Sequence, residues 1–120
     1  MRIPFELPDF DDGLDEAKGS IYLEDEFLVI RLDIGFLGLT TDRRELIKAE
    51  AGIIGGIRFE PKFTGDWLII TTDNTQLLQA VPGDHVSDIK LKTQKKHRND
   101  VFRFVVRVED WIKNAKKDAS

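Results

Sequence analysis

The sequence predicts a mainly β fold in which about seven short antiparallel strands are followed by one C-terminal amphipathic helix. Between Gly19 and Thr93, apolar and polar residues alternate in short runs separated by turn residues, as expected of half-buried strands. From Val101 onward the apolar residues instead recur at helical spacing. The chain has 120 residues and no cysteine, so one hydrophobic core without disulfides is expected, and a second domain is not.

Residues 1–18 are expected to form an acidic N-terminal arm, and residues 19–117 a single domain. Pro4 and Pro8 disfavour regular structure in the arm, and a cluster of aspartates between residues 9 and 15 adds negative charge. The glycine in this cluster does not stand where a calcium-binding EF-hand loop places it, and no glutamate ends the loop. We therefore expect a solvated arm and no metal site.

Three strands are expected in the first half of the domain. The run 21–24 alternates apolar and polar residues, and the turn 24–26 joins it to a β-rich run at 27–33, which together predict a hairpin. An apolar loop is expected at 35–39. After it, segment 44–50 alternates apolar and charged residues and predicts the third strand.

Four further strands are expected before the helix. Turn residues at 64–66 and 73–74, together with Pro82 and Gly83, separate the runs. Pro61 cannot donate a backbone hydrogen bond, so its strand is expected at an edge or a bulge. The four predicted strands are 57–63, 67–72, 76–81 and 89–93.

A single amphipathic helix is expected to close the chain. Asn99 or Asp100 can cap its N-terminus by accepting hydrogen bonds from free backbone N–H groups. Phe102 and Val106 lie off the apolar stripe, so either the buried face is wide, which we expect, or this part of the helix contacts another chain. The stripe consists of Val101, Phe104, Val105, Val108, Trp111 and Ile112.

Charge is distributed unevenly along the chain. The net charge is −4, yet residues 1–50 carry 6 basic and 13 acidic groups, whereas residues 90–117 carry 10 basic and 3 acidic groups. Halves of opposite charge meet in the fold or occupy opposite faces, so a uniformly positive surface for nucleic acid is not expected. No apolar run approaches the ~20 residues of a membrane span, and no signal peptide opens the chain, so we expect a soluble cytoplasmic protein.

Three segments carry a resemblance to a known superfamily. The resemblance lies in the residues of segments 19–23, 67–72 and 77–83 and in the order of seven strands followed by one helix. In these features the sequence resembles the bacterial pleckstrin-homology-like (PH-like) domains. The resemblance covers about residues 19–115. It implies a barrel of two nearly orthogonal antiparallel sheets, closed at one end by the helix, that serves as a binding scaffold without chemistry of its own.

The resemblance also bears on lipid binding. Phosphoinositide-binding members of the superfamily usually carry Lys and Arg around the loop between the first two strands, whereas the corresponding loop here is expected to be Glu24-Asp25-Glu26. Three carboxylates would repel a polyanion. Selective phosphoinositide binding is therefore not expected.

One dense basic group follows the last predicted strand. Residues 90 and 92 point the same way along a strand and, with the basic residues that follow, can form one anion-attracting patch. The alternative, which we favour, is a charged edge that prevents the addition of foreign strands. The possible anion-binding residues are Lys90, Lys92, Lys95, Lys96 and Arg98.

Two consecutive connections between strands contain large apolar side chains. If both were exposed, they would form a patch that a soluble monomer seldom leaves uncovered, so self-association to a homo-oligomer is expected. The alternative is that the two loops bury each other within one molecule. The residues concerned are Phe36, Leu37, Leu39, Ile53 and Ile54.

Catalysis is not expected. His85 and His97 are the only histidines, and the chain has no Gly-x-Ser-x-Gly motif and no nucleotide-binding loop. No cofactor or metal is predicted. The sequence favours a non-catalytic binding or scaffold module that acts through a protein partner or through self-association. The alternative is an anion or membrane-surface binder that uses the basic patch Lys90–Arg98.

Overall fold

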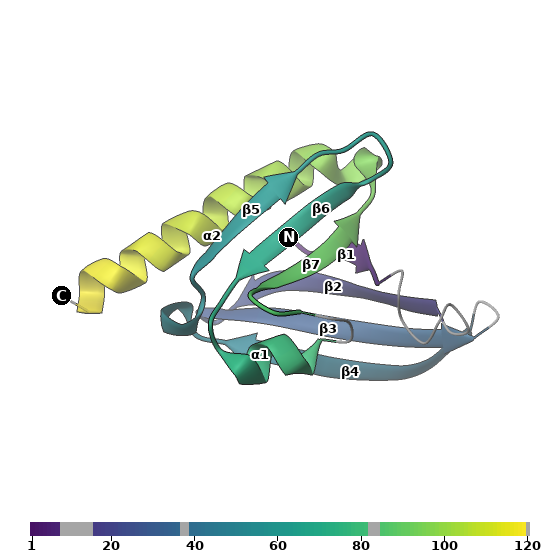
Figure 1. Cartoon of the computed structure of the whole chain (residues 1–120), viewed down its shortest axis with the longest axis horizontal. Helices are drawn as coiled ribbons and strands as arrows, with labels where there is room; N and C mark the ends of the chain where they lie inside the picture. The colour runs from purple at the N-terminus through teal and green to yellow at the C-terminus, as the bar shows by residue number, and fades with distance from the viewer. Residues whose placement is uncertain (8–15, 37–38, 82–84, 120) are drawn as a thin grey trace.

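The computed structural model describes residues 1–7, 16–36, 39–81 and 85–119, and the side chains of residues 1–7, 18–33, 44–81 and 85–117. It confirms a mainly β fold with a C-terminal helix (Figure 1). The strands are β1 (Ile3–Glu6), β2 (Glu16–Glu24), β3 (Phe27–Phe36), β4 (Leu39–Ala49), β5 (Gly56–Glu60), β6 (Asp66–Thr71) and β7 (Asp88–Thr93). The helical elements are η2 (Ala51–Ile53), α1 (Thr75–Ala80), η3 (Lys95–His97) and α2 (Arg98–Ala119).

All seven strands belong to one antiparallel sheet of order β4-β3-β2-β1-β7-β6-β5. Strands β5–β7 run obliquely to β2–β4, so the sheet bends around the short central strand β1 (Figure 1). The expected closed barrel is wrong, because β4 and β5 are the two ends of the sheet and do not pair. Helices contact these end strands instead: α2 packs against β5 and η2, and α1 packs against β4.

The central strand β1 lies within the segment expected to be an extended arm. Ile3 and Phe5 are buried, whereas the intervening Pro4 is exposed, so four residues suffice for a two-faced strand. Glu6 stands opposite Lys18 of β2 on one side and Lys92 of β7 on the other. β1 therefore joins the two halves of the sheet. The aspartate cluster at 9–15 lies outside the described residues.

The predicted strand at 76–81 is wrong, because this segment forms the short helix α1. Oδ1 of Asn74 accepts a hydrogen bond from the backbone N–H of Leu77 at 3.1 Å and so caps the helix. Leu77 and Leu78 are both buried. Both leucines belong to the core, so the short helix covers part of it.

Strands β3 and β4 extend further than the sequence predicted. Phe36 ends β3 and Leu39 begins β4, so the expected apolar loop at 35–39 is largely replaced by paired backbone. The register shifts at two points along β3, where β4 contains extra residues that have no partner. Irregularities of this kind let two strands with different numbers of residues remain paired. Leu37 and Gly38 lie outside the described residues.

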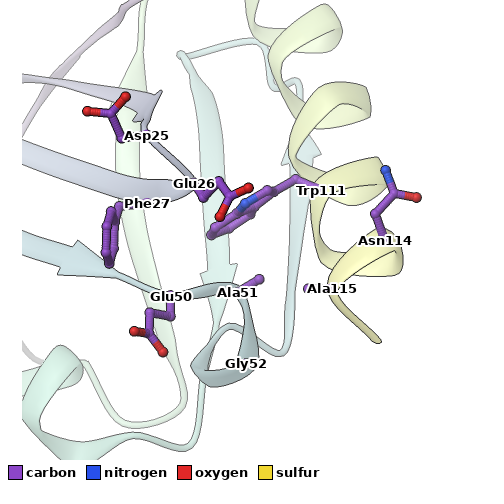
Figure 2. A pocket seen from close by; sticks show the side chains of 9 residues that line it. All are labelled: Asp25, Glu26, Phe27, Glu50, Ala51, Gly52, Trp111, Asn114 and Ala115. Carbon is purple, nitrogen blue, oxygen red and sulfur yellow. The ribbon is translucent and has the colours of Figure 1, made fainter. Parts of the chain in front are cut away.

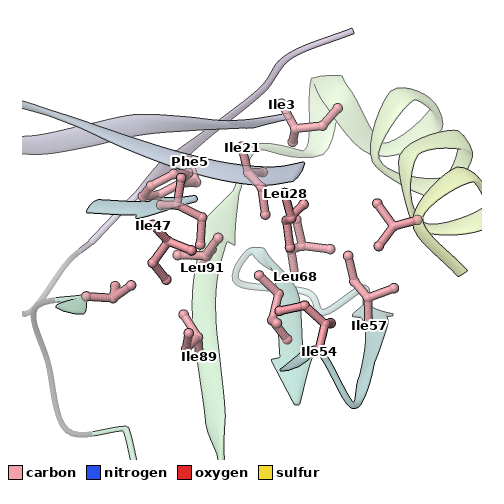
Figure 3. Close-up of a cluster of buried hydrophobic side chains, with 14 of the residues drawn as sticks. Ile3, Phe5, Ile21, Leu28, Ile47, Ile54, Ile57, Leu68, Ile89 and Leu91 are labelled. Carbon is pink, nitrogen blue, oxygen red and sulfur yellow. The ribbon is translucent and has the colours of Figure 1, made fainter. Parts of the chain in front are cut away.

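The apolar stripe of α2 packs onto the sheet as predicted. Phe104 is 1% exposed and is among the largest fully buried side chains, whereas Trp111 is half-buried and packs at the margin of the core. Figure 3 shows isoleucine and leucine side chains from both halves of the sheet converging on one interior. Within the described ranges, no helix combines the length and apolar character that crossing a bilayer requires.

Two expectations about α2 are wrong. Phe102 and Val106 are 63% and 44% exposed, so the buried face of the helix is narrow and does not include them. The helix also begins at Arg98, directly after η3, which places Asn99 and Asp100 inside the first turn instead of at the cap. Asp100 still complements the positive end of the helix dipole.

Candidate functional site

A concavity of about 470 Å³ lies between the β2–β3 turn, η2 and the C-terminal half of α2. We call it the acidic groove because three carboxylates line it. Figure 2 shows Trp111 extending from α2 towards Glu26 and Ala51, with Asp25 and Glu50 on the side formed by the strand ends. The groove is lined by Asp25, Glu26, Phe27, Glu50, Ala51, Gly52, Trp111, Asn114 and Ala115.

The two-residue turn of the β2–β3 hairpin presents two of these carboxylates. Glu24 pairs with Phe27, so Asp25 and Glu26 are the central residues of the turn. Both have positive φ angles, 49° and 69° respectively, as the favoured tight hairpin turn requires. Asn-Gly and Asp-Gly are favoured pairs for such a turn, so Asp25 suits its position, whereas Glu26 stands where glycine is preferred, at a cost of the order of 1 kcal/mol. The chain thus has a charged residue, Glu26, where glycine would fold more easily.

Aromatic rings form the apolar part of the acidic groove. Trp111 and Phe27 stand on opposite elements, α2 and β3, and both are only partly buried. The ammonium group of Lys48 lies 4.9 Å from the centre of the Phe27 ring at the rim of the groove. Phe27 therefore already binds one cation through its π face.

The chemistry of the acidic groove suits an organic cation. Carboxylates attract positive charge, and the faces of tryptophan and phenylalanine rings add cation–π attraction. The groove also adjoins the last turns of α2, where Lys116 and Lys117 offset the negative end of the helix dipole, so the attraction for a cation comes from the carboxylates and the rings. In the described part of the chain, no group of three or more His, Asp or Glu side chains is arranged to hold a metal ion.

A second concavity, of about 220 Å³, lies where β1, β2 and β7 meet the approach to α2. We call it the basic pocket, because Lys18, Lys92, Lys96 and His97 line it, together with one acidic residue, Glu6. Oε1 of Glu6 accepts a hydrogen bond from Nε2 of Gln94 at 3.4 Å. Three lysines against one glutamate leave this pocket positive.

The five residues of the predicted anion patch separate into different environments. Only Lys92 and Lys96 line the basic pocket. Lys90 is exposed two residues away along β7. The Nζ atom of Lys95 lies 5.0 Å from the centre of the Phe63 ring, and Arg98 is engaged in an ion pair with Asp66.

The ion pair between Asp66 and Arg98 fixes the β5–β6 turn to the start of α2. Nη2 and Nε of Arg98 donate to the two carboxylate oxygens of Asp66 at 2.8 Å and 3.0 Å, and the backbone N–H of Lys62 donates to Oδ1 at 3.2 Å. The hydrogen bonds from Arg98 are the main cause that lowers the pKa of the fully buried Asp66 carboxyl. Arg98 is therefore occupied and is not available to an incoming anion.

The turn that this ion pair anchors carries an exposed aromatic residue. Phe63 is 94% exposed at the tip of residues 61–65, which we call the Phe63 turn. The backbone N–H of Gly65 donates to the carbonyl of Lys62 at 3.3 Å, and Gly65 has a φ of +145°, a conformation that favours glycine. The Phe63 turn is thus a defined projection, and the cation nearest its exposed ring is Lys95, because Lys62 pairs with Glu60 at 4.0 Å.

The residues of the predicted apolar interaction surface, like those of the predicted anion patch, lie in different environments. Ile54 is 3% exposed and belongs to the core, and Ile53 packs partly buried against it. The 3₁₀ turn η2 directs Ile54 inward, so this connection does not supply the exposed patch that was expected. The side chains of Phe36, Leu37 and Leu39 lie outside the described residues.

Sequence reasoning missed the acidic groove, although one of its signals was visible. The Glu24-Asp25-Glu26 turn, which the sequence predicts to join the first two strands, joins β2 and β3. β1 ends at Glu6 and β2 begins at Glu16, and residues 8–15 between them lie outside the described residues, so the expected absence of selective phosphoinositide binding stays a prediction. Glu50 and Trp111 are distant in sequence and meet these carboxylates only in the fold.

Comparison with known proteins finds no matching family model, no similar curated protein and no similar solved structure. The two concavities and the charges that line them are the features of this molecule that point to a function.

Proposed function

We propose that this chain is a non-catalytic interaction module that binds a basic segment of a protein partner in the acidic groove. The observation that carries the proposal is that Asp25, Glu26 and Glu50 line one concavity of about 470 Å³ together with Trp111, whose ring lies next to Glu26 (Figure 2). A lysine or arginine side chain bound there would meet carboxylates and aromatic faces together.

The strained β2–β3 turn supports the same proposal. Asp25 and Glu26 hold positive φ angles that an Asn-Gly turn would adopt at lower cost. Backbone strain of this kind is typical of positions whose side chains have a function that less strained residue types could not provide. Here the retained property is negative charge at the mouth of the groove.

The fold that we propose for this module is PH-like. The oblique arrangement of β5–β7 against β2–β4 and the final helix packed against β5 support it (Figure 1). In this proposal the two halves of the bent sheet correspond to the two sheets of the superfamily, with β1 continuous between them. Such scaffolds bind partners at their surfaces and lack chemistry of their own.

Binding of a basic peptide tests the proposed function. With Trp67→Phe, Trp111 remains as the reporting tryptophan, and its fluorescence should change when a peptide of alternating Arg and Phe residues is added. Glu26→Lys combined with Glu50→Lys should weaken binding by about tenfold or more, because two exposed attractive charges become repulsive.

The matched control exchanges two exposed carboxylates outside the groove. Glu45→Lys combined with Asp73→Lys changes the net charge by the same amount and should leave peptide affinity within about twofold, apart from the general effect of net charge. Equal loss in both double variants, or an unchanged Trp111 signal at saturating peptide, would refute the proposed site.

A second candidate function is supported by the basic pocket. Lys18, Lys92 and Lys96 converge there, and within the described residues no hydrogen bond or ion pair joins their ammonium groups to a partner. Such a pocket suits a small anion such as a phosphate group or, at a membrane surface, a lipid headgroup. This candidate ranks second because Glu6 lies inside the pocket and opposes an anion.

Titration with inorganic pyrophosphate, followed by NMR chemical shifts, tests the second candidate. Lys96→Ala should weaken binding and Glu6→Gln should strengthen it, whereas Lys90→Ala removes the same charge from β7 outside the pocket and should have little effect. Vesicles with and without anionic lipid distinguish a membrane source of the anion from a soluble one. Equal effects of Lys90→Ala and Lys96→Ala would show that only diffuse charge is involved.

A further inference from the structure

The molecule carries a feature that matches its own acidic groove. The Phe63 turn presents an almost fully exposed aromatic ring, and the ammonium group of Lys95 lies over that ring at 5.0 Å. Lys62, the residue before it, adds a second positive charge that Glu60 partly offsets in an ion pair of 4.0 Å. The acidic groove presents carboxylates around the partly buried ring of Trp111. The two surfaces are therefore opposite in charge and both aromatic.

The Phe63 turn and the acidic groove lie towards opposite ends of α2. The Phe63 turn is anchored to Arg98 at the start of the helix, whereas Trp111 and Ala115 line the groove near its other end (Figure 1). At 1.5 Å per residue, the helical positions 98 and 111 are about 20 Å apart. A molecule cannot insert its own Phe63 turn into its own groove, so this match can be satisfied only between two molecules.

The exposure of Phe63 is the second reason to assign it a partner. Its ring contacts the ammonium group of Lys95 at 5.0 Å but is otherwise open to water. The turn around it is held by the buried carboxylate of Asp66 and by the backbone of Lys62 and Gly65. A preorganised turn loses little conformational entropy on binding, which favours an anchoring role for the ring at its tip.

We propose that this protein associates head to tail, with the Phe63 turn of one copy bound in the acidic groove of the next. The proposal rests on the proposed function, because it names a second copy of this chain as the source of the basic segment. Phe63 packs beside Trp111 and Phe27 of the neighbour, and Lys62 and Lys95 approach its Asp25, Glu26 and Glu50.

The contact has a consequence for the size of the assembly. Because the two contacting surfaces are different, each copy in a pair leaves one groove and one Phe63 turn unoccupied. Further copies add until the chain of molecules closes into a ring or is limited by concentration. The average mass should therefore continue to rise above that of a dimer as concentration increases.

Sedimentation of complementary variants tests the proposal. The turn variant carries Phe63→Ser and Lys95→Glu, and the groove variant carries Glu26→Lys and Glu50→Lys; each alone should associate at least about tenfold more weakly than the wild type. Mixed in equal amounts they should form a heterodimer that does not grow, because the groove of the first and the Phe63 turn of the second remain intact.

The matched control replaces an exposed phenylalanine and an exposed lysine elsewhere, with Phe102→Ser and Lys90→Glu, and should associate like the wild type. Wild-type protein that stays monomeric, or association lost in this control, would overturn the inference. If the wild type is monomeric and its acidic groove still binds the basic peptide, the proposed function stands and only the second copy as partner is refuted.

Discussion

Arg98 holds both carboxylate oxygens of Asp66, and through this pair the first residue of α2 is tied to the first residue of β6. Asp66 is fully buried, whereas the Arg98 side chain is 45% exposed. The carboxylate also accepts the backbone N–H of Lys62, so one side chain organises the helix start and the Phe63 turn together. Because its negative charge is buried, the pair is expected to matter more to stability than an ordinary surface ion pair.

The stability of the fold should depend on Asp66 in acid. Its pKa is lowered in the folded state, chiefly by the hydrogen bonds from Arg98, so its contribution is fully present above the unfolded-state value of about 4. That contribution is lost as the pH falls through the lower, folded-state pKa. Asp66→Asn should lower the denaturation midpoint at pH 7 and flatten its dependence on pH below about 4.

Urea denaturation at a series of pH values measures this effect. Asp73→Asn is the control, because Asp73 is an exposed carboxylate in the connection between β6 and α1. Its curve should follow that of the wild type across the same range. An Asp66→Asn variant with an unchanged acid profile would contradict the role assigned to the pair.

The β2–β3 turn should show a conflict between stability and binding. Replacing its centre with Asp25→Asn and Glu26→Gly relieves the positive φ of Glu26 and should stabilise the fold by about 1 kcal/mol. The same change removes two carboxylates from the acidic groove and should weaken basic-peptide binding by about fivefold to tenfold. Thermal unfolding and Trp111 fluorescence measure the two effects. A variant that gains stability without losing affinity would show that the turn is not retained for binding.

Two buried threonines should respond in opposite ways to the same substitution. Thr93 and Thr72 are each 2% exposed, but within the described residues the hydroxyl of Thr93 has no hydrogen-bond partner. The hydroxyl of Thr72 donates to the carbonyl of Ile53 at 2.6 Å and accepts from the N–H of Asn74 at 3.1 Å.

Thr93→Val should therefore stabilise the protein by about 1 kcal/mol, because it removes an unsatisfied buried polar atom. Thr72→Val should destabilise it by about 1–3 kcal/mol, because it leaves the carbonyl of Ile53 and the N–H of Asn74 without this partner. Chemical denaturation of the two variants side by side checks the prediction, and equal effects would contradict it.

The two phenylalanines of α2 lie on different faces of the helix, so their substitution should affect stability differently. Phe104→Ala should cost about 3–5 kcal/mol, because it opens a cavity in the centre of the core. Phe102→Ala should change stability by no more than about 0.5 kcal/mol, because its ring is exposed. Trp111→Ala should fall between them, since Trp111 is half-buried at the margin of the core. Urea denaturation gives all three values, and a large loss at Phe102 would mean that the outer face of α2 is covered by another chain.

The patterns that the sequence could predict are local ones. The stripe that contains Val101, Phe104 and Val108 has helical spacing, and residues 21–33 alternate across a visible turn, so α2 and the β2–β3 hairpin follow from neighbouring residues alone. The segment around Leu77 is predicted to be a strand but forms a helix. Six residues are too few for the spacing of apolar residues to distinguish a short helix from a strand. Ile3 and Phe5 were misread because the acidic residues after them outweighed a two-residue apolar alternation.

What only the tertiary structure decided is which distant residues meet. Glu26, Glu50 and Trp111 form one groove because the bent sheet and α2 bring three separate segments together. Lys18 joins Lys92 and Lys96 because β1 pairs with both β2 and β7. Residues 90–98 are predicted from the sequence to form one basic patch. In the fold they belong to a strand, a 3₁₀ turn and the start of a helix, which direct their side chains differently. The buried carboxylate of Asp66 also holds Arg98 in an ion pair. Periodicity along a chain records which face a residue takes, whereas contacts across the fold depend on strand order and sheet bending, which no local pattern contains.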